Sequence, residues 1–586
     1  MLPTLPVLIT LDSRPTPLHS VLLHTGDKLL IESLMEDVEV SYPNYIIAHR
    51  SNKENNMKRS LIVMGLCLTI LGCQSTPKPE IGRNLELREL ATAQKLESLR
   101  TDPAALTQFL KTMPKGADLH NHLSGAVTTE RLIEWAIADN LCVDPKTWTA
   151  GSCKLKPLPI AKAATDKALY QTLLSQWSMD KFQGPLLAAH QHFFDAFGKF
   201  SAVLSDERTD DAIADVLATA GKHHQMYVEL MQGFGASQVS SLGEKYLPAS
   251  DAWTEANLLE KRKQIIADPL FRSTLTKNAA NLKTALEGAR KLLSCDKPAP
   301  DLGCEVEVRF LVSANRTKDR GAVFAQWVYG YELAQATPLV VGVELVSPEE
   351  APNSLRYYDD EMYALNVLQR FNQADASRTT VHIALHAGEL IPEVLPATPA
   401  GQAHLKYHIR QAIEVANAER IGHGTNVLED EKPLELLQLM REKNVLAEIC
   451  LTSNFVLLGK SGSSHPVNTY LEHNVPAALA TDDEGILRNN ITDEFVRAVT
   501  VQHLEYPALK KMVRSSLEHS FLPGASLWKI ADQFDQVADA CAGEVLGSAK
   551  PAEACAHWLN THKRAAMQWK LESKFNTFEN TVTPQL

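Results

Sequence analysis

Between about residues 113 and 486, short apolar runs alternate with longer stretches of mixed apolar and polar residues. Short apolar runs are typical of β-strands, and the longer stretches between them have helical spacing. Strands separated by helical stretches favour a parallel sheet with crossover helices. Eight such runs predict a closed (β/α)8 TIM-type barrel. They are residues 117–122, 226–231, 306–314, 339–345, 380–385, 420–422, 445–450 and 477–480.

Two wide gaps interrupt this alternation, at about residues 142–225 and 240–305. Both have helical spacing, so we expect them to be helical insertions. The segment after residue 490 predicts closing helices rather than a second domain. We therefore expect residues 101–586 to form one elaborated barrel domain.

The beginning of the chain has a different pattern. After Met57, two basic residues precede an uncharged apolar run from Leu61 to Gly72. This run is shorter than the roughly 20 residues of a membrane-spanning helix, but it suits the core of a signal peptide. It ends in Ile-Leu-Gly-Cys, which resembles the lipobox of bacterial lipoproteins, so Cys73 is the expected lipid attachment site. A short buried helix is the alternative.

We accordingly expect residues 1–56 to be an upstream extension from a mis-assigned start, 57–72 a signal peptide, and 73–100 a lipid anchor and tether. Gln74 resembles the outer-membrane sorting signal of Gram-negative lipoproteins. The expected location is therefore the cell envelope, with membrane contact only through the lipid on Cys73. The sequence leaves open which membrane face carries the protein.

Export changes how the cysteines are interpreted, because disulfides persist in oxidising compartments. Six cysteines form three close sequence pairs, although other pairings remain open: Cys142 with Cys153, Cys295 with Cys304, and Cys541 with Cys555. Cys450 lies in an apolar run and is expected to be a free core thiol. No CxxC pair is present, which excludes zinc ribbons and thioredoxin-type redox motifs.

Charge and composition narrow the function classes further. Lys and Arg number 58 against 70 for Asp and Glu, a formal net charge of −12. This balance repels phosphate backbones, so nucleic acid is not an expected partner. The hydrophobic content of 45% is that of a globular protein with a large core.

Polar and ionisable residues follow several of the apolar runs, where barrel enzymes carry their chemistry. His120 and His122 end the first run, and side chains two apart on a strand point to the same side. Both imidazoles can therefore face one metal ion. His190 and His192 have the same spacing in a helical pattern, where such side chains diverge, so we interpret that pair as structural.

Further candidates lie at the ends of later runs: His386 and Glu389 in VHIALHAGEL, His423 in RIGHG, and Asp482 with Asp483 in ALATDDEG. Adjacent residues project differently, so one aspartate can bind a metal while the other faces a substrate. Three histidines and a carboxylate suit an ion such as zinc in a catalytic site.

The series MPKGADLHNHLSG, HAGE, GHG, SN and TDD resembles the adenosine deaminase family of the metal-dependent amidohydrolase superfamily, including its secreted growth-factor-like branch. The resemblance implies a (β/α)8 barrel and zinc-dependent hydrolytic removal of an amino group from a purine. It implies one Zn²⁺ per chain with four ligands: His120, His122, His386 and Asp482.

The resemblance also implies roles for three other residues. Glu389 would protonate purine nitrogen 1, His423 would orient or deprotonate the attacking water, and Asp483 would hydrogen-bond nitrogen 7. Four more residues match family positions as supporting groups: Glu229, Arg316, Ser453 and Asn454. Phe193, Phe194, Phe197 and Phe200 could form a lid, but their helical spacing favours core packing.

Two departures from the family pattern concern the substrate. Ser124 replaces the aspartate of HLDG, and Ser347 stands where the family has a glycine whose backbone amide contacts the purine. The expected reaction is deamination of adenosine or 2′-deoxyadenosine outside the cytoplasm, in purine nucleoside salvage. The partner is then a small-molecule purine nucleoside. The alternatives are an aminohydrolase for another purine or modified nucleoside, and a non-enzymatic nucleoside-binding lipoprotein. The oligomeric state stays open.

Overall fold

The computed structural model describes residues 80–583, with side chains from residue 86 onward. Its central element is an eight-stranded parallel sheet with neighbours in the order β1-β5-β6-β7-β8-β9-β10-β11. These strands are β1 (Gly116–His122), β5 (Gln225–Gln232), β6 (Glu307–Asn315), β7 (Val340–Val346), β8 (His382–Ala387), β9 (Arg420–His423), β10 (Leu446–Ile449) and β11 (Ala477–Leu479). Each overlaps one predicted strand.

Backbone contacts between β1 and the residues after β11 complete the ring. Asn121 and Asp482 form a parallel bridge. The Asp482 N–H donates to the His120 carbonyl at 2.9 Å, and the His122 N–H donates to the Asp482 carbonyl at 3.1 Å. The predicted (β/α)8 barrel is therefore confirmed. The same peptides that close it carry candidate metal ligands.

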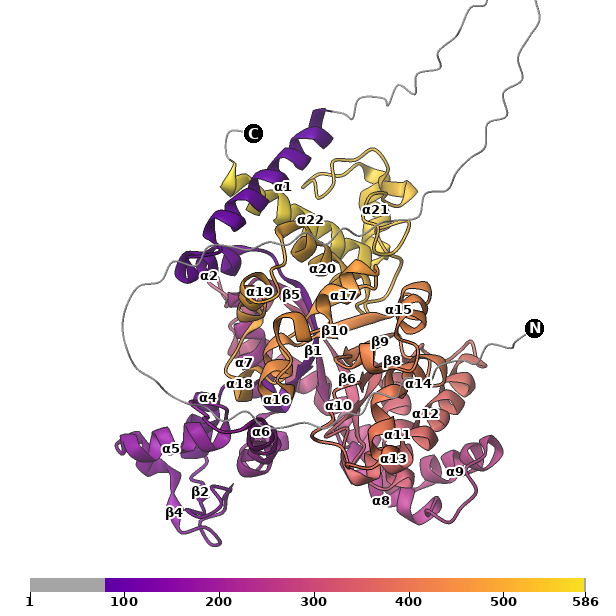
Figure 1. Cartoon of the computed structure of the whole chain (residues 1–586). Helices are drawn as coiled ribbons and strands as arrows, with labels where there is room; N and C mark the ends of the chain where they lie inside the picture. Colours follow the sequence, from indigo (N-terminus) through magenta and orange to yellow (C-terminus); the bar gives the residue numbers. More distant parts are fainter. Residues whose placement is uncertain (1–79, 584–586) are drawn as a thin grey trace, which may run out of the picture. The chain divides into compact units, whose positions relative to one another are not determined.

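Helices surround the strands (Figure 1). Those between β1 and β5 are α3 (Leu123–Ala126), α4 (Thr129–Ala138), α5 (Lys167–Trp177), α6 (Leu186–Phe200) and α7 (Thr209–Lys222). Those between β5 and β6 are α8 (Ala236–Tyr246), α9 (Glu255–Ala267) and α10 (Pro269–Leu292). The later crossovers contain α11 (Arg320–Ala336), α12 (Pro352–Gln373), α13 (Pro399–Ala403), α14 (His408–Glu414), α15 (Pro433–Glu442), α16 (Leu451–Leu458) and α17 (Val467–Glu472).

The first predicted insertion contains an element that its helical spacing did not reveal. Three two-residue strands form a small antiparallel sheet: β2 (Cys142–Val143), β3 (Ala150–Gly151) and β4 (Leu158–Pro159). The second insertion contains two long helices. It contains α9 and α10, and Asp268 caps the start of α10 by accepting from the Leu270 N–H.

The remaining helices come before the first barrel strand or after the last one along the chain. They are α1 (Glu80–Leu99), α2 (Pro103–Thr112), α18 (Glu484–Leu487), α19 (Ile491–Thr500), α20 (Tyr506–Glu518), α21 (Glu553–Thr561) and α22 (Lys563–Val582). α1 lies beside α22 (Figure 1). Buried Glu579 of α22 accepts from the Tyr506 hydroxyl and from Lys510, each at 2.7 Å. Lys510 also binds Glu89 of α1, so one charged cluster ties three helices together.

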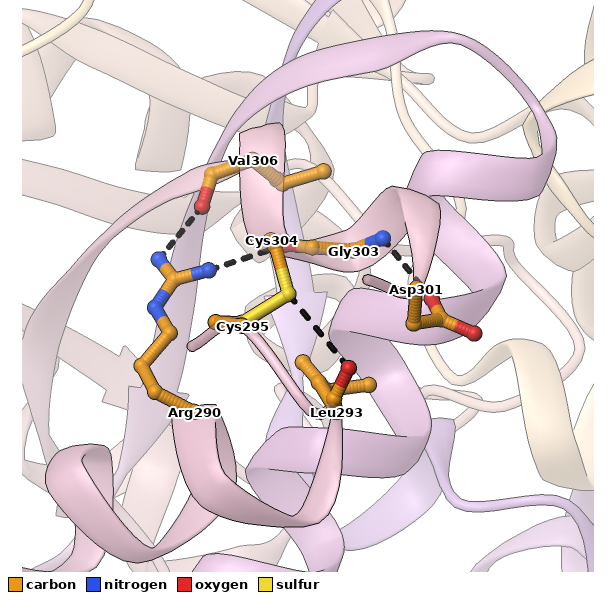
Figure 2. Close-up of a disulfide and its surroundings, with 7 residues drawn as sticks. All are labelled: Arg290, Leu293, Cys295, Asp301, Gly303, Cys304 and Val306. Carbon is orange, nitrogen blue, oxygen red and sulfur yellow. Dashed lines mark hydrogen bonds between the residues drawn. A yellow bond between two sulfur atoms is a disulfide. The ribbon is translucent and has the colours of Figure 1, made fainter. Parts of the chain in front are cut away.

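Three disulfides join the close sequence neighbours that could pair: Cys142–Cys153, Cys295–Cys304 and Cys541–Cys555. Figure 2 shows the second, in the turn that leads into β6. The Arg290 guanidinium donates to the carbonyls of Gly303 and Val306 at 2.9 and 2.6 Å. The turn before β6 is thereby held by one covalent and two polar links. Cys450 is buried with a free thiol, as expected.

The predicted extension, signal peptide and lipid-bearing Cys73 lie outside the described residues. Across residues 80–583, no helix combines the length and apolar character that crossing a bilayer requires.

Candidate metal and catalytic site

A cavity of about 450 Å³ lies where several barrel strands end. Its lining includes eight of the nine site residues predicted within the described chain: His122, Ser124, Ser347, His386, Glu389, His423, Asp482 and Asp483. His120, the ninth, is fully buried beside it. Residues separated by more than 350 positions thus meet at one end of the barrel.

The four predicted metal ligands converge. Asp482 Oδ1 lies 3.3 Å from His122 Nε2 and 3.5 Å from His120 Nε2. His122 Nε2 lies 3.2 Å from His386 Nε2. His423 also has a ring nitrogen within 4.8 Å of the ligand atoms of His120, His386 and Asp482.

Two buried carboxylates orient His120 and His386 by hydrogen-bonding the ring nitrogen Nδ1 of each. Glu448 on β10 lies 2.7 Å from His120 Nδ1, and Glu344 on β7 lies 2.7 Å from His386 Nδ1. A carboxylate at Nδ1 fixes the tautomer in which Nε2 presents its lone pair, an arrangement common at zinc sites. The sequence reasoning missed both glutamates. The available signal was a charged residue inside an otherwise apolar strand.

The donor set fits a divalent metal ion. His120 Nε2 is buried and has no hydrogen-bond partner among the described residues, although a buried polar atom normally has one. Asp482 Oδ1 lies 3.5 Å from this nitrogen, and ligand atoms of His386 and His423 lie within 4.8 Å. Imidazole nitrogens and a carboxylate oxygen are the ligand types that bind zinc.

Glu389 and His423 face each other across the cavity, with 3.6 Å between Glu389 Oε1 and His423 Nε2. Burial, with the nearby charges of Asp482 and Glu349, raises the pKa of Glu389 well above its ordinary value. Burial lowers the pKa of His423 to about 3. Burial therefore favours the protonated form of Glu389 and the neutral form of His423.

The Asn454 side-chain amide sets the tautomer of His423. Asn454 Nδ2 lies 2.9 Å from His423 Nδ1, which accepts its hydrogen bond. His465 Nε2 lies 3.0 Å from Asn454 Oδ1 and holds the amide in this orientation. His423 consequently carries its proton on Nε2, the nitrogen that faces Glu389. This tautomer favours hydrogen-bond donation into the cavity over proton abstraction.

Asp483 is buried beside the metal ligands, and its Oδ1 has no hydrogen-bond partner among the described residues. Burial, followed by the charge of Asp482, raises the pKa of Asp483 well above its ordinary value. A protonated carboxyl in the cavity wall can donate to an acceptor nitrogen of a ligand.

Three cavity-lining residues have left-handed backbone conformations that residues other than glycine rarely adopt. φ is +81° at Ser347, +63° at His423 and +63° at Asp482. Such conformations cost roughly 1–3 kcal/mol and gather at functional sites. Gly422 shows a related constraint, because an added Cβ would lie 2.7 Å from the ring of His120. Gly422 therefore makes room for the candidate ligand His120 rather than for substrate.

One side of the cavity is aromatic. Phe193, Phe194 and Phe197 of α6 line it while also packing against the barrel core, and Phe200 lies only in the core. The interpretation of this run as core packing is therefore incomplete for three of the four residues. Polar atoms lie elsewhere in the lining, including Ser313 Oγ and Gln326 Nε2, which lack described hydrogen-bond partners.

A buried ion network continues from the ligands into the barrel. Arg420 lies 2.7 Å from both Glu448 Oε1 and Glu229 Oε2. The guanidinium balances two carboxylates that would otherwise be costly to bury. Glu229 thus pairs with Arg420 and is absent from the cavity lining.

The other residues singled out in the sequence occupy supporting positions. Arg316 is buried and donates to the carbonyls of Leu345 and His386. Ser453 is buried next to Asn454. His190 pairs with Glu350 and His192 lies against backbone carbonyls, so neither joins the ligand group.

Parts of the chain are similar to known proteins. Residues 292–537 match the family model described as "Adenosine deaminase". Over 143 residues, 24% of this chain, the sequence is 33% identical to an adenosine deaminase of Plasmodium knowlesi, of which the match covers 36%. Over 157 residues, 26% of this chain, it is 34% identical to an adenosine deaminase of Escherichia coli strain SE11, of which the match covers 41%. The matches thus span well under half the length of these relatives.

Solved structures also align with the chain. An adenine deaminase from Arthrobacter aurescens has 18% identity and a TM-score of 0.44, covering 70% of this chain and 94% of its own. An amidohydrolase from Burkholderia ambifaria with bound Zn has 13% identity and a TM-score of 0.47, covering 82% of this chain and 96% of its own.

Proposed function

We propose that this chain, whose residues 292–537 match the adenosine deaminase family model, is a zinc-dependent aminohydrolase. It converts adenosine or 2′-deoxyadenosine to the corresponding inosine product and ammonia. One observation carries the proposal. His120 and His122 lie on β1, outside the matched region, and yet they meet His386 and Asp482 from within that region.

Zinc bound by His120, His122, His386 and Asp482 would supply Lewis acidity, which makes water a strong nucleophile near neutral pH. Glu389, kept protonated by burial, donates its proton to purine nitrogen 1 and makes carbon 6 electrophilic. The neutral His423 donates from Nε2 to the incoming oxygen and orients it. Water adds at carbon 6 and the bond to the amino nitrogen breaks. The proton given to nitrogen 1 stays in the product, one proton of the water restores the Glu389 carboxyl, and the other leaves with the amino group as ammonia.

Asp483 and Ser347 hold the purine in this scheme. The protonated Asp483 carboxyl donates to nitrogen 7, which has a lone pair and no proton. Ser347 lines the same cavity in a left-handed backbone conformation, and we assign its backbone amide as the second donor to the purine. Ring recognition thus uses one side-chain donor and one backbone donor.

The charge of the cavity favours a substrate without phosphate. Its described lining has no lysine or arginine, and it includes the carboxyls of Glu389, Asp482 and Asp483. A nucleotide phosphate would find no lysine or arginine in this lining to balance its charge. We therefore expect nucleosides to be preferred over AMP. Ser124 lines the cavity in place of the family's aspartate, which keeps another purine or modified nucleoside as the second candidate.

A substrate panel with Glu389→Gln tests the reaction. Wild-type protein is expected to deaminate adenosine and 2′-deoxyadenosine faster than adenine or AMP. E389Q is expected to lose turnover and keep its zinc, because its amide preserves shape but cannot supply the proton. The matched control is Glu393→Gln, an exposed site four residues along the chain. Activity confined to non-nucleosides would select the second candidate. Turnover unchanged in E389Q would refute the role of Glu389.

We also propose that the chain is exported and anchored to the bacterial cell envelope through a lipid on Cys73, where it serves nucleoside salvage. The lipobox-like sequence motivates this location, and the three disulfides support an oxidising compartment. Cell fractionation with Cys73→Ser tests it. The variant should leave the membrane fraction and lose an acyl label, whereas an unlabelled wild-type protein in the cytoplasm would contradict the proposal.

A further inference from the structure

Glu349 is a fully buried carboxylate just outside the cavity lining. It follows the Ser347–Pro348 segment after β7. Its Oε1 accepts from the Gly388 N–H at 3.1 Å, and its Oε2 accepts from the Glu389 N–H at 2.8 Å. One side chain thus accepts hydrogen bonds from two consecutive backbone N–H groups of the segment that carries Glu389.

His408 of α14 holds Glu349 from the other side. Its Nδ1 lies 2.6 Å from Glu349 Oε1. The His408 ring stacks on Tyr358, with centroids 3.6 Å apart and planes 6° from parallel. His408 Nε2 lies 2.9 Å from Nδ1 of the partly exposed His404. The imidazole therefore has a fixed orientation, with both nitrogens hydrogen-bonded.

The charge state of Glu349 makes these contacts strong. Burial alone would raise its pKa, but the hydrogen bond and charge of His408, with Arg316 and the Gly388 amide, lower the pKa to about 2. Arg316 Nη1 lies 3.9 Å from Glu349 Oε2. The carboxylate is therefore ionised at neutral pH. Hydrogen bonds from backbone N–H groups to an ionised acceptor are shorter and stronger than neutral ones.

We propose that Glu349 and His408 are positioning residues, which clamp the Glu389 peptide so that its carboxyl faces His423 and the bound purine. This inference rests on the proposed function of Glu389. Neither residue lines the cavity, so both act through the backbone. A catalytic group displaced by about 1 Å can lose on the order of 100-fold in rate, so such a clamp bears directly on turnover.

Glu349→Gln tests the clamp. The glutamine amide has one oxygen and cannot accept from two peptide N–H groups in the same geometry. We expect kcat to fall about 10- to 100-fold, with KM and zinc per chain unchanged. The matched control is Glu350→Gln, because the neighbouring Glu350 pairs with His190 and is absent from the cavity lining. His408→Phe, which keeps a ring beside Tyr358 but removes the donor, is a second variant should E349Q fail to fold.

A double-mutant cycle with E389Q separates positioning from general destabilisation. If Glu349 acts through Glu389, E349Q/E389Q should be no slower than E389Q alone. Independent effects would instead multiply. Multiplying losses, a loss of zinc from E349Q, or equal kcat in E349Q and E350Q would each overturn the proposal.

Hydrogen–deuterium exchange supplies a readout that does not need turnover. The Gly388 and Glu389 amides should exchange at least about tenfold faster in E349Q than in wild type or E350Q, because both lose their acceptor. Unchanged exchange would overturn the clamp. A wild type inactive on every purine would instead refute the proposed function, while the exchange result would still decide the clamp.

Discussion

Gly125 and Asp483 are packed so closely that a Cβ on the glycine would lie 1.6 Å from Asp483 Oδ1. Glycine in HLSG therefore sets the position of the carboxyl that we assign to purine nitrogen 7. Gly125→Ala should displace Asp483 and reduce kcat/KM by about 100-fold while the protein still folds. Steady-state kinetics and a thermal melt check this. Gly198→Ala is the control, because a Cβ there meets nothing within 4 Å. Equal activity in the two variants would contradict the assignment.

Ser347 has the backbone conformation of a glycine, with φ of +81°. Ser347→Gly should relieve this strain and raise the free energy of unfolding by about 0.5–1 kcal/mol, less than the strain itself because glycine also makes the unfolded chain more flexible. The backbone amide is retained, so deamination should persist. Denaturant unfolding measures the change. Ser273→Gly, at an exposed position within α10, should destabilise by a similar amount. A destabilised S347G would contradict the strain argument.

Glu448 lies 2.7 Å from His120 Nδ1 and also faces Arg420. Glu448→Gln removes the negative charge that strengthens this imidazole as a ligand. We expect the zinc dissociation constant to rise about 10- to 100-fold, as measured by competition with a chelator. Glu442→Gln, on the exposed side of nearby α15, should bind zinc like wild type. Unchanged affinity in E448Q would show that His120 does not depend on this carboxylate.

Glu361 of α12 is fully buried, and neither of its oxygens has a hydrogen-bond partner among the described residues. Burial raises its pKa well above the ordinary value, against an opposing effect of Arg316. The folded state therefore holds this proton more tightly than the unfolded state, and Glu361 lowers stability increasingly as pH rises above the unfolded pKa of about 4.3. The glutamine side chain in Glu361→Gln does not titrate. Its gain in melting temperature should be small at pH 5 and larger at pH 8, and a gain that shrinks with pH would contradict this sign.

Much of the barrel was predictable because the sequence of a buried parallel strand is an apolar run, here with polar residues at its end. His120, His386 and Asp482 follow such runs, and the order of the strands brings them to one edge. The small β2–β4 sheet was not predictable from periodicity, since its two-residue strands are too short to show an alternation.

The groups that support the site were harder to find. Glu344 and Glu448 are single charges within apolar strands, and only the folded barrel shows that they face histidines. The role of Phe193 depends on which side of α6 faces the cavity, which helical spacing does not specify. Glu349 contacts backbone N–H groups nearly forty residues away, and no side-chain motif records such a contact.

In the proposed enzyme, four side chains from β1, the end of β8 and the residues after β11 hold one catalytic divalent ion. Metal analysis paired with adenosine turnover on the same full-length preparation tests it most directly. We expect one zinc per chain, loss of inosine production when a chelator removes the zinc, and its return when zinc is restored. A metal-free preparation with full deaminase activity would contradict it.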